Sequence, residues 1–378
     1  MKIARAEVFA YRLRLDSPIP LRGRDLPERT GLLLRLESES GRQSWGEAAP
    51  LPGFSRETVA ACRRKLEEAL AALRSLEGGA ERDSIRGLRA FRGPIAHSAS
   101  YFAVESAWRR LQAEDHGVSP WHDKAPDRAP IIQLNALLAG TEERILARAQ
   151  EAATQGYRAV KLKVGRDRMT DDIRVVRAVR EAIGPGVALR LDANQAWSIE
   201  DAVLFGKAVA ASDIAYIEEP CQQFGDLPAF RLRTGIPYAI DESIFTVHDM
   251  LRGRGKTPLP ERALAGIVQE AEALVWKPTL VHTPTLGDLL FHDVAQGQSS
   301  RIVISAAFES GVGTAALANY AAMFASPDTP AGLDTYTWIA PDILRERLPL
   351  QGGAADLNAI NAAAETVDTD RLTRVWAL

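Results

Sequence analysis

The amino-acid sequence predicts an α/β protein in which a TIM-like (β/α) barrel follows an N-terminal α+β domain. Short apolar runs with the character of strands start near residues 131, 159, 188, 214, 238, 273 and 302, roughly one βα unit apart. Helical patterns alternate with these runs, and no glycine-rich phosphate loop favours the doubly wound alternative. In such a barrel the reactive groups lie at the carboxyl ends of the strands. The residues that end these runs are therefore the candidates for a functional site.

The first part of the chain has a different pattern. Residues 2–14 and 31–37 have the pattern of antiparallel strands, and helical spacing follows over 55–73 and about 97–112. Strands followed by helices are typical of an α+β domain. A boundary after this domain is indicated by three prolines in a polar stretch, Pro120, Pro126 and Pro130.

The helices of the barrel have their own sequence signals. Ser198 and Asp201 have the spacing of a capping box at the start of a helix. Another helix is predicted from an apolar stripe formed by Ile173, Val176, Val179 and Ile183.

Composition and charge narrow the classes of function. The 378 residues are 46% hydrophobic and 25% charged, with a formal net charge of −3, which gives no electrostatic reason to expect nucleic acid or a membrane surface as partner. The first residues have the pattern of a strand rather than a signal peptide, and no apolar run approaches the ~18 residues that cross a bilayer. Cys62 and Cys221 are too few for a disulfide framework or a zinc site, so we expect a cytoplasmic protein.

The run at 159–164 carries two lysines on one face. Because side chains alternate along a strand, Lys161 and Lys163 share one face, and the three apolar residues between and beside them share the other. Cations inside a sheet need carboxylate partners, since an unpaired buried charge is costly. The sequence supplies such partners downstream.

Acidic residues end three successive runs. Asp192, Glu218 and Asp241 come from neighbouring strands about 4.8 Å apart, so their carboxylates could surround one cation. Oxygen ligands without His or Cys select Mg²⁺ or Mn²⁺ over zinc. Arg190 and Asn194 share a strand face with Asp192 and are candidates for binding a substrate. The neighbouring acids Glu219, Glu242 and Asp201 are interpreted as helix caps or surface ion pairs.

The lysines flank this acidic trio. Lys163 lies one strand before it and Lys277 one strand after it, so the two lysines face each other across the expected metal. This arrangement suits removal of a proton next to a carboxylate, because a metal that holds the carboxylate stabilises the developing negative charge and a nearby lysine can act as the base.

The chain resembles the enolase superfamily, in its muconate-lactonizing subgroup, through five motifs in fixed order: KxK at 161–163, DAN at 192–194, EEP at 218–220, DES at 241–243 and KP at 277–278. The resemblance covers nearly the whole chain. It implies that Mg²⁺ is held by Asp192, Glu218 and Asp241, that Lys163 is the general base with Lys161 as its partner, and that Lys277 acts from the opposite face. It also implies an enolase-like fold with a capping α+β domain at 1–127, a (β/α)7β barrel at 128–333 and a C-terminal segment at 334–378 that packs back on the cap.

Within that superfamily the chain is most similar to the o-succinylbenzoate synthases of menaquinone biosynthesis. The stretches that carry this likeness are 45–58, 218–221, 304–313 and 332–335. The resemblance implies a lyase that dehydrates the small carboxylate 2-succinyl-6-hydroxy-2,4-cyclohexadiene-1-carboxylate. Contacts to this substrate are expected from Ser305, Ser310 and Gly311, where the backbone amides before a helix could bind a carboxylate, and from Arg24 in the polar loop after Leu21.

Other functions stay open at this point. Two opposed lysines also suit a 1,1-proton transfer, so an N-acylamino acid racemase, a dipeptide epimerase or a muconate cycloisomerase is the alternative on the same scaffold. A barrel that has lost catalysis is a further alternative, although such a loss usually breaks the metal triad or removes the base. The oligomeric state is left open.

Overall fold

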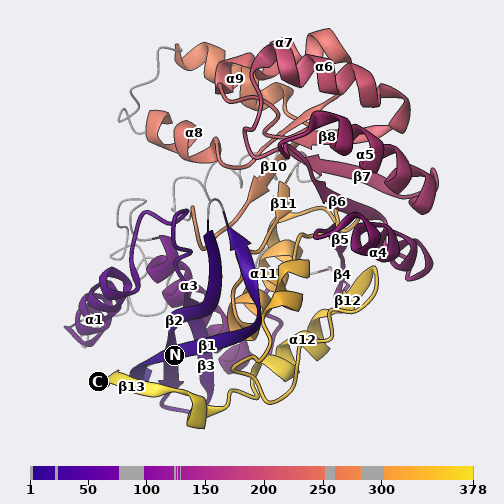
Figure 1. Cartoon of the computed structure of the whole chain (residues 1–378). Coiled ribbons are helices and arrows are strands. Elements are labelled where there is room, and N and C mark those ends of the chain that lie inside the picture. Colours follow the sequence, from indigo (N-terminus) through magenta and orange to yellow (C-terminus); the bar gives the residue numbers. More distant parts are fainter. Residues whose placement is uncertain are drawn as a thin grey trace.

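The computed structural model contains an antiparallel sheet with its own helices and a parallel sheet curled into a barrel (Figure 1). The fold class predicted from the sequence is therefore confirmed. The structure describes residues 3–21, 24–75, 98–122, 125, 127, 129–251, 260–281 and 302–377.

The antiparallel sheet and two helices form the cap. The strands are ordered β13-β1-β2-β3, so the last strand of the chain lies at one edge of the sheet. Both predicted strands are longer than the sequence pattern indicated, because β1 and β2 continue as one long hairpin. The elements of the cap are β1 (Ile3–Leu21), β2 (Arg24–Ser38), β3 (Gln43–Ala48), α1 (Val59–Ser75), α3 (Ser98–His116) and β13 (Thr373–Ala377).

Both faces of the cap sheet are buried. Val8 and Leu34 pack against the cap helices, whereas Tyr11 and Leu33 point to the opposite face and join the core shared with the barrel. Alternation along the strands thus supplies two separate apolar surfaces. The sheet also approaches α3 closely at Gly46, where an added Cβ would lie 2.0 Å from the carbonyl oxygen of Ala103. Burial on both faces fixes the cap against the barrel.

The barrel is built on parallel strands in the order β11-β10-β9-β8-β7-β6-β5. Six of the strand starts predicted from the sequence coincide with observed starts, from 159 to 302. The barrel strands are β5 (Asn135–Leu138), β6 (Ala159–Lys163), β7 (Ala188–Asp192), β8 (Ile214–Glu218), β9 (Tyr238–Ile240), β10 (Ala273–Trp276) and β11 (Ile302–Ile304).

A short segment at residues 331–332 joins the two edge strands. The amide of Gly332 donates to the carbonyl of Ile304 over 2.8 Å on one side, and the amide of Asn135 donates to the carbonyl of Ala331 over 3.0 Å on the other. Isolated parallel bridges link the same segment to Leu134 and Ser305. The segment therefore acts as the eighth strand and closes the barrel.

The prediction of a barrel strand at residue 131 needs a correction. Residues 131–133 form β4 (Ile131–Gln133), which pairs antiparallel with β12 (Ala354–Asp356) outside the barrel. The first barrel strand is β5, which begins only at Asn135. The two apolar runs are separated by one residue, so their sequence pattern does not distinguish the two strands.

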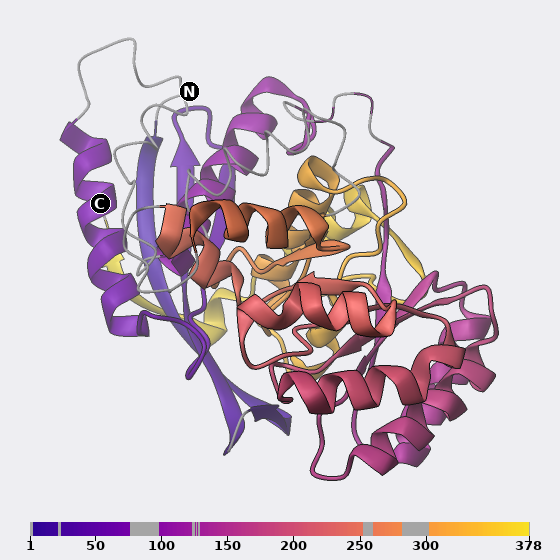
Figure 2. The same ribbon diagram turned by 90° about the horizontal axis from the view of Figure 1, so that it is seen from above.

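Helices pack along the outer side of the barrel strands (Figure 2). The capping box predicted at the start of one of them is confirmed, since the Ser198 hydroxyl donates to Asp201 over 2.7 Å and accepts from its amide. The helices that follow barrel strands are α4 (Glu142–Thr154), α5 (Met169–Ile183), α6 (Ile199–Val209), α7 (Leu227–Thr234), α8 (Ile244–Leu251), α9 (Glu261–Glu270) and α11 (Gly311–Phe324), with 3₁₀ turns η3 (Ala210–Ser212) and η4 (Phe224–Asp226).

The C-terminal segment runs from the barrel back to the cap. Its last strand pairs antiparallel with β1, with Val8 opposite Trp376. The elements on this path are η6 (Asp334–Trp338), β12, α12 (Leu357–Ala364), η7 (Thr369–Arg371) and β13.

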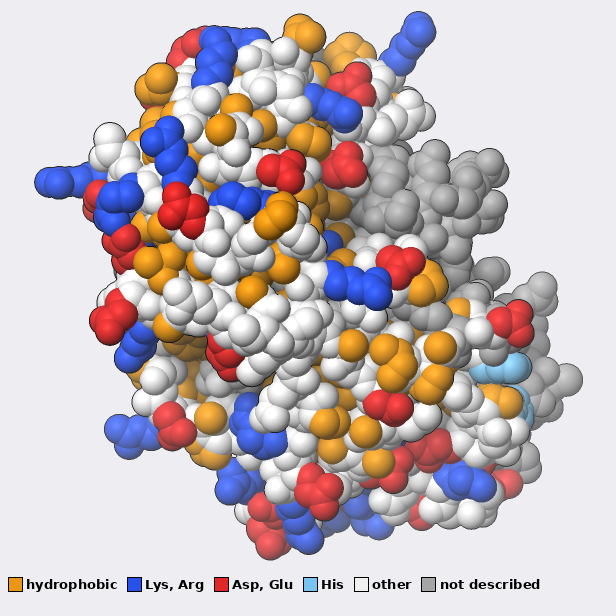
Figure 3. All heavy atoms as spheres, turned by 90° about the vertical axis from the view of Figure 1, so that its right-hand side faces the viewer, with side chains coloured by type: hydrophobic (Ala, Val, Ile, Leu, Met, Phe, Trp, Pro, Cys, Tyr) orange, Lys and Arg blue, Asp and Glu red, His pale blue; other side chains and the backbone are white. Residues whose placement is uncertain are grey.

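Acidic and basic side chains are interspersed on the face of the molecule in Figure 3. Among the described residues, no helix is both long and apolar enough to cross a membrane.

Candidate active site

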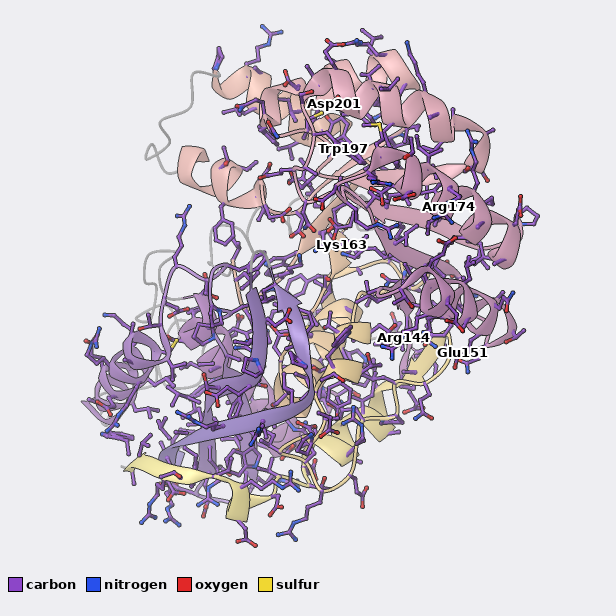
Figure 4. The ribbon with its side chains drawn as sticks, viewed as in Figure 1. Arg144, Glu151, Lys163, Arg174, Trp197 and Asp201 are labelled. Atoms are coloured by element: carbon purple, nitrogen blue, oxygen red, sulfur yellow. The ribbon has the colours of Figure 1, made fainter. Side chains whose placement is uncertain are left out.

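A cavity lies at the carboxyl ends of the barrel strands and is bounded on one side by the cap. Its polar lining includes the ends of several barrel strands, and its apolar lining comes from both the cap and the barrel. Figure 4 shows Lys163 in this region, between the barrel helices and the cap. The polar lining contains Asn135, Lys161, Lys163, Asp192, Asn194, Lys277, Ser305, Asp334 and Thr335, and the apolar lining includes Leu21, Leu51, Phe54, Leu137, Leu280, Phe308 and Trp338.

Lys161 lies between two of the predicted metal ligands. Its Nζ is 3.2 Å from Glu218 Oε1 and 3.4 Å from Asp192 Oδ2. Burial by itself would lower the pKa of Lys161, but the carboxylates of Glu218 and Asp192 outweigh it and raise that pKa above its ordinary value. Lys161 therefore stays a cation and holds the two carboxylates together.

Lys277 pairs with the third predicted ligand. Its Nζ donates to Asp241 Oδ2, and the Asp241 carboxylate raises the pKa of Lys277 against the opposite effect of burial. Burial would raise the pKa of Asp241, but Lys277 and a hydrogen bond with Glu218 lower it below its ordinary value. Glu218 differs, because burial raises its pKa well above the usual range although Lys161 opposes this. The carboxylates of Glu218 and Asp241 are therefore close together.

Lys163 has a different environment from the other two lysines. It lines the same cavity as Lys161, as the alternation on β6 predicts, but its side chain is exposed. Among the described ion pairs, Lys161 and Lys277 each bind an acid of this site, whereas Lys163 takes part in none. Its amine therefore faces the space in which a substrate would lie.

The donor set fits a hard divalent cation. Three buried carboxylates face two lysines that are bonded to them, so one negative charge is left without a cation. Burial raises the pKa of Glu218, and the neighbouring charges of Asp192 and Asp241 add to this effect against those of Lys161 and Lys277. Among the described residues, no three His, Cys, Asp or Glu side chains are grouped in the arrangement of a bound metal. The chemistry of the oxygens suits Mg²⁺, and the lysines occupy part of the space between them.

The interpretation of Glu219 as a helix cap or a surface ion pair is wrong. Its side chain is fully buried and accepts hydrogen bonds from the amides of Asp241 and Ser243 at 2.9 and 2.8 Å. Its own backbone has a φ of +46°, in the left-handed region that residues other than glycine rarely occupy. Glu219 thus fixes the backbone that carries Asp241.

The same interpretation is wrong for Glu242 and correct for Asp201. Glu242 accepts a hydrogen bond of 2.8 Å from the side-chain amide of Asn194, and burial together with the charge of Asp241 raises the pKa of Glu242 to about 7. Asp201 belongs to the cap of helix α6, because its side chain accepts from the Ser198 hydroxyl and its amide donates to that hydroxyl, and it lies at the outside of the barrel, away from Lys163 (Figure 4).

The predicted substrate-binding residues fall into two groups. Asn194 and Ser305 line the cavity. Arg190 is buried in the barrel instead, where its guanidinium donates to Asn135 Oδ1 at 3.2 Å and to the carbonyl of Pro330 at 2.9 Å, and it is not part of the cavity lining. Arg190 therefore links β7 to β5, two strands away, and to the carbonyl that precedes the closing segment at 331–332.

Ser310 and Gly311 do bind carboxylates, but those of the chain itself. Ser310 donates from its hydroxyl and its amide to Glu47 at 2.6 and 3.1 Å, and the amide of Gly311 donates to Asp342 at 3.1 Å. The start of helix α11 is therefore filled, and the expectation of a substrate carboxylate at these two residues is corrected. The contact predicted for Arg24 lies outside the described residues, because the structure does not describe the side chain of Arg24.

Sequence reasoning missed the buried polar residues between the cap and the barrel. Tyr11 donates to Glu47, and Glu309 accepts a hydrogen bond from Thr279. Arg29 donates to carbonyls of both domains. A charged residue inside the apolar stretch at 45–51 is the one signal that could have pointed to Glu47, because acids are rarely buried without partners.

Two family models match the chain. The model described as "Enolase C-terminal domain-like" matches residues 144–253, and that described as "MenC, N-terminal domain" matches residues 3–84. Solved structures with the same fold include the L-Ala-D/L-Glu epimerase from Bacillus subtilis, with 22% identity, a TM-score of 0.75 and coverage of 94% of this chain and 96% of that one. A member of the enolase superfamily from Roseovarius nubinhibens, complexed with magnesium, has 22% identity and a TM-score of 0.77 over 100% of this chain and 99% of that one.

Curated relatives are more similar in sequence. The o-succinylbenzoate synthase of Klebsiella pneumoniae is 33% identical over 345 residues, which cover 90% of this chain and 93% of that protein. The o-succinylbenzoate synthase of Enterobacter sp. is 34% identical, with the same shares covered, and that of Escherichia coli O9:H4 is 33% identical over 87% of this chain and 90% of the relative. The chain is therefore an enzyme of the enolase superfamily and belongs to its o-succinylbenzoate synthase family.

Proposed function

We propose that this enzyme dehydrates 2-succinyl-6-hydroxy-2,4-cyclohexadiene-1-carboxylate to 2-succinylbenzoate, a step of menaquinone biosynthesis. The observation that carries the proposal is the arrangement of charges at one cavity: Asp192 and the lysines Lys161, Lys163 and Lys277 line it, and Lys161 and Lys277 bind the carboxylates of the next two strands, Glu218 and Asp241. The family of the chain and the apolar wall of the cavity, which suits a six-membered carbon ring, support it.

Lys163 is the proposed base. Its exposed amine in the cavity takes the proton from the carbon beside the substrate carboxylate. The C–O bond to the ring hydroxyl then breaks, the same proton leaves with the hydroxide as water, and the ring becomes aromatic. Lys161 keeps Asp192 and Glu218 in place, and Lys277 contributes a positive charge opposite Lys163.

Asp192, Glu218 and Asp241 are the proposed ligands of Mg²⁺, with Mn²⁺ as a substitute. When bound, the metal supplies positive charge next to the substrate carboxylate and so favours loss of the adjacent proton. Glu219 fixes the amide of Asp241 and thereby orients one ligand.

The test follows the absorbance of the diene substrate, which is consumed as the benzene ring forms. The purified wild type is assayed once in the presence of Mg²⁺ and once in the presence of EDTA. The Lys163→Ala variant is assayed beside it, and Lys207→Ala, on the outer helix α6, is the control. Rapid loss of the diene that needs Mg²⁺ and Lys163, but not Lys207, supports the proposal. No loss with folded, metal-bound protein contradicts it.

Racemisation of an N-acylamino acid or epimerisation of a dipeptide is the second candidate. It is favoured by one observation, that Lys163 and Lys277 line the same cavity, because a 1,1-proton transfer needs one lysine on each side. Incubation of N-succinylamino acids in D₂O tests it, since a racemase incorporates deuterium at the α-carbon. An enzyme that only dehydrates leaves these compounds unlabelled.

A further inference from the structure

Arg29 is a buried cation at the contact between the cap and the barrel. It belongs to β2, and the residue is only 1% exposed. Its Nε donates to the carbonyl of Phe308 at 2.8 Å, and its Nη1 donates to the carbonyl of Pro50 at 2.8 Å. Nη2 donates to the carbonyl of Ala49. One guanidinium therefore joins a cap loop to the barrel loop that follows β11.

The two loops whose carbonyls Arg29 binds also contribute residues to the cavity wall. Ala49 and Pro50 precede Leu51, which lines the cavity from the cap side. Phe308 lines it from the barrel side. The planar guanidinium offers donors in fixed directions, so it sets the distance between these two parts of the wall.

Phe308 is held in an unusual backbone conformation. Its φ is +62°, in the left-handed region that a bulky side chain rarely occupies. Such a conformation persists only where its surroundings fix it. Arg29 fixes the carbonyl of Phe308, and the Glu309 side chain fixes the preceding turn, because it accepts a hydrogen bond of 2.6 Å from the amide of Ala307.

The Glu309 side chain also connects this turn to the loop of Lys277. It accepts a hydrogen bond from the Thr279 hydroxyl, two residues after Lys277. Burial raises the pKa of Glu309 and of Glu47, and the nearby charge of Arg29 counteracts the effect at both. Arg29 is thus the cation of a buried network that holds the loops around the cavity.

We propose that Arg29 is a positioning residue that fixes Phe308 against the cap wall and so sets the shape of the pocket for the substrate ring. The inference rests on the proposed function, since it concerns the substrate of that same cavity. Arg29 does not line the cavity, so it acts through Phe308 and Leu51 and not by touching the substrate.

Arg29→Lys is the main test, with Arg180→Lys as the matched control. Arg180 also donates to several backbone carbonyls, among them those of Ser212 and Val187 at 2.9 and 2.8 Å, but at the amino-terminal end of the barrel. Arg29→Lys keeps the charge but loses the forked geometry, so KM for the diene should rise on the order of 10-fold with a smaller change in kcat. Arg180→Lys should leave both constants unchanged.

A double-mutant cycle separates positioning from general stability. Phe308→Ala alone should raise KM, and in that background Arg29→Lys should add less than about a 2-fold change, because the two residues act through one wall. Equal factors in both backgrounds would overturn the proposal. So would a normal KM for Phe308→Ala, which can be measured even where Arg29→Lys does not fold.

Hydrogen exchange of the full chain with Mg²⁺ keeps this test apart from the test of the reaction. Arg29→Lys should speed exchange in peptides covering 49–54 and 304–310, and Arg180→Lys should not. Faster exchange in Arg29→Lys, together with a wild type that does not consume the diene, would contradict the proposed function but support the positioning role of Arg29. Unchanged exchange in Arg29→Lys, together with a wild type that consumes the diene, would contradict the positioning role of Arg29 alone.

Discussion

Glu47 of the cap binds Ser310 at the first turn of the last barrel helix. The Ser310 hydroxyl donates to Glu47 Oε2 at 2.6 Å, and its amide donates to Oε1 at 3.1 Å. The amide of Gly313 donates to the same carboxylate at 2.7 Å, and an added Cβ at Gly313 would lie 2.5 Å from it. A carboxylate at a helix N-terminus satisfies amides that lack partners within the helix. This contact joins the two domains beside the cavity.

Glu47→Gln should destabilise the protein. The amide nitrogen that replaces one carboxylate oxygen would face donors on Ser310 and Gly313, so the free energy of unfolding should fall by about 2 kcal/mol. Urea denaturation measures the change. Glu200→Gln, which removes an exposed ion pair with Arg233, is the control and should leave the urea midpoint unchanged. Equal midpoints for both variants would show that the contact of Glu47 with α11 contributes nothing.

The stability of the cap should depend on pH through Glu57. Burial raises the pKa of Glu57 above its ordinary value of 4.5, although hydrogen bonds from Ala99 and Ser100 oppose this. Between the unfolded and the folded pKa the folded state therefore binds more protons, so stability falls as pH rises upward from 4.5. The unfolding free energy of the wild type minus that of Glu57→Gln should therefore decrease as the pH rises over that range. An increase of this quantity with pH would show that burial does not raise the pKa of Glu57.

Mg²⁺ should raise the melting temperature of the wild type, because a ligand of the folded state alone stabilises it. Asp241→Asn should lose both the temperature shift and turnover, since it removes a proposed ligand and the partner of Lys277. Lys163→Ala should keep the shift and lose turnover by at least about 100-fold. Near-normal turnover of Lys163→Ala would exclude this lysine as the base, and a shift retained in Asp241→Asn would exclude Asp241 as a ligand.

Glu219→Gln should weaken metal binding without removing a ligand. Glu219 accepts from the amides of Asp241 and Ser243, and loss of such a supporting group typically lowers metal affinity by about 10 to 100-fold. A titration of melting temperature against Mg²⁺ concentration measures the affinity, with Glu200→Gln as the control. An unchanged Mg²⁺ affinity would show that the backbone of Asp241 holds its position without Glu219.

Most barrel strands were predictable from the sequence because each is a short apolar run that ends in, or is followed directly by, a polar residue. Residues 159, 188 and 214 start both a run and a strand. The wrong strand prediction at residue 131 has a local cause. Near residue 131 two strands follow each other with one residue between them, and only their hydrogen-bond partners, β12 in one case and β6 in the other, tell them apart.

The fold class and the residue types of the catalytic cavity follow from the sequence alone, because strand alternation and strand ends are local properties. Lys161 and Lys163 share a face on β6 whatever the rest of the chain does. The hydrogen-bond and ion-pair partners of each acid depend instead on how the strands and domains pack together. Glu218 and Glu219 are adjacent and chemically identical, yet Glu219 accepts a hydrogen bond from the amide of Asp241 while Glu218 forms an ion pair with Lys161. Likewise Glu47 reaches Ser310 across 263 residues, because long-range contacts depend on how the two domains pack and leave no periodic signal in the sequence.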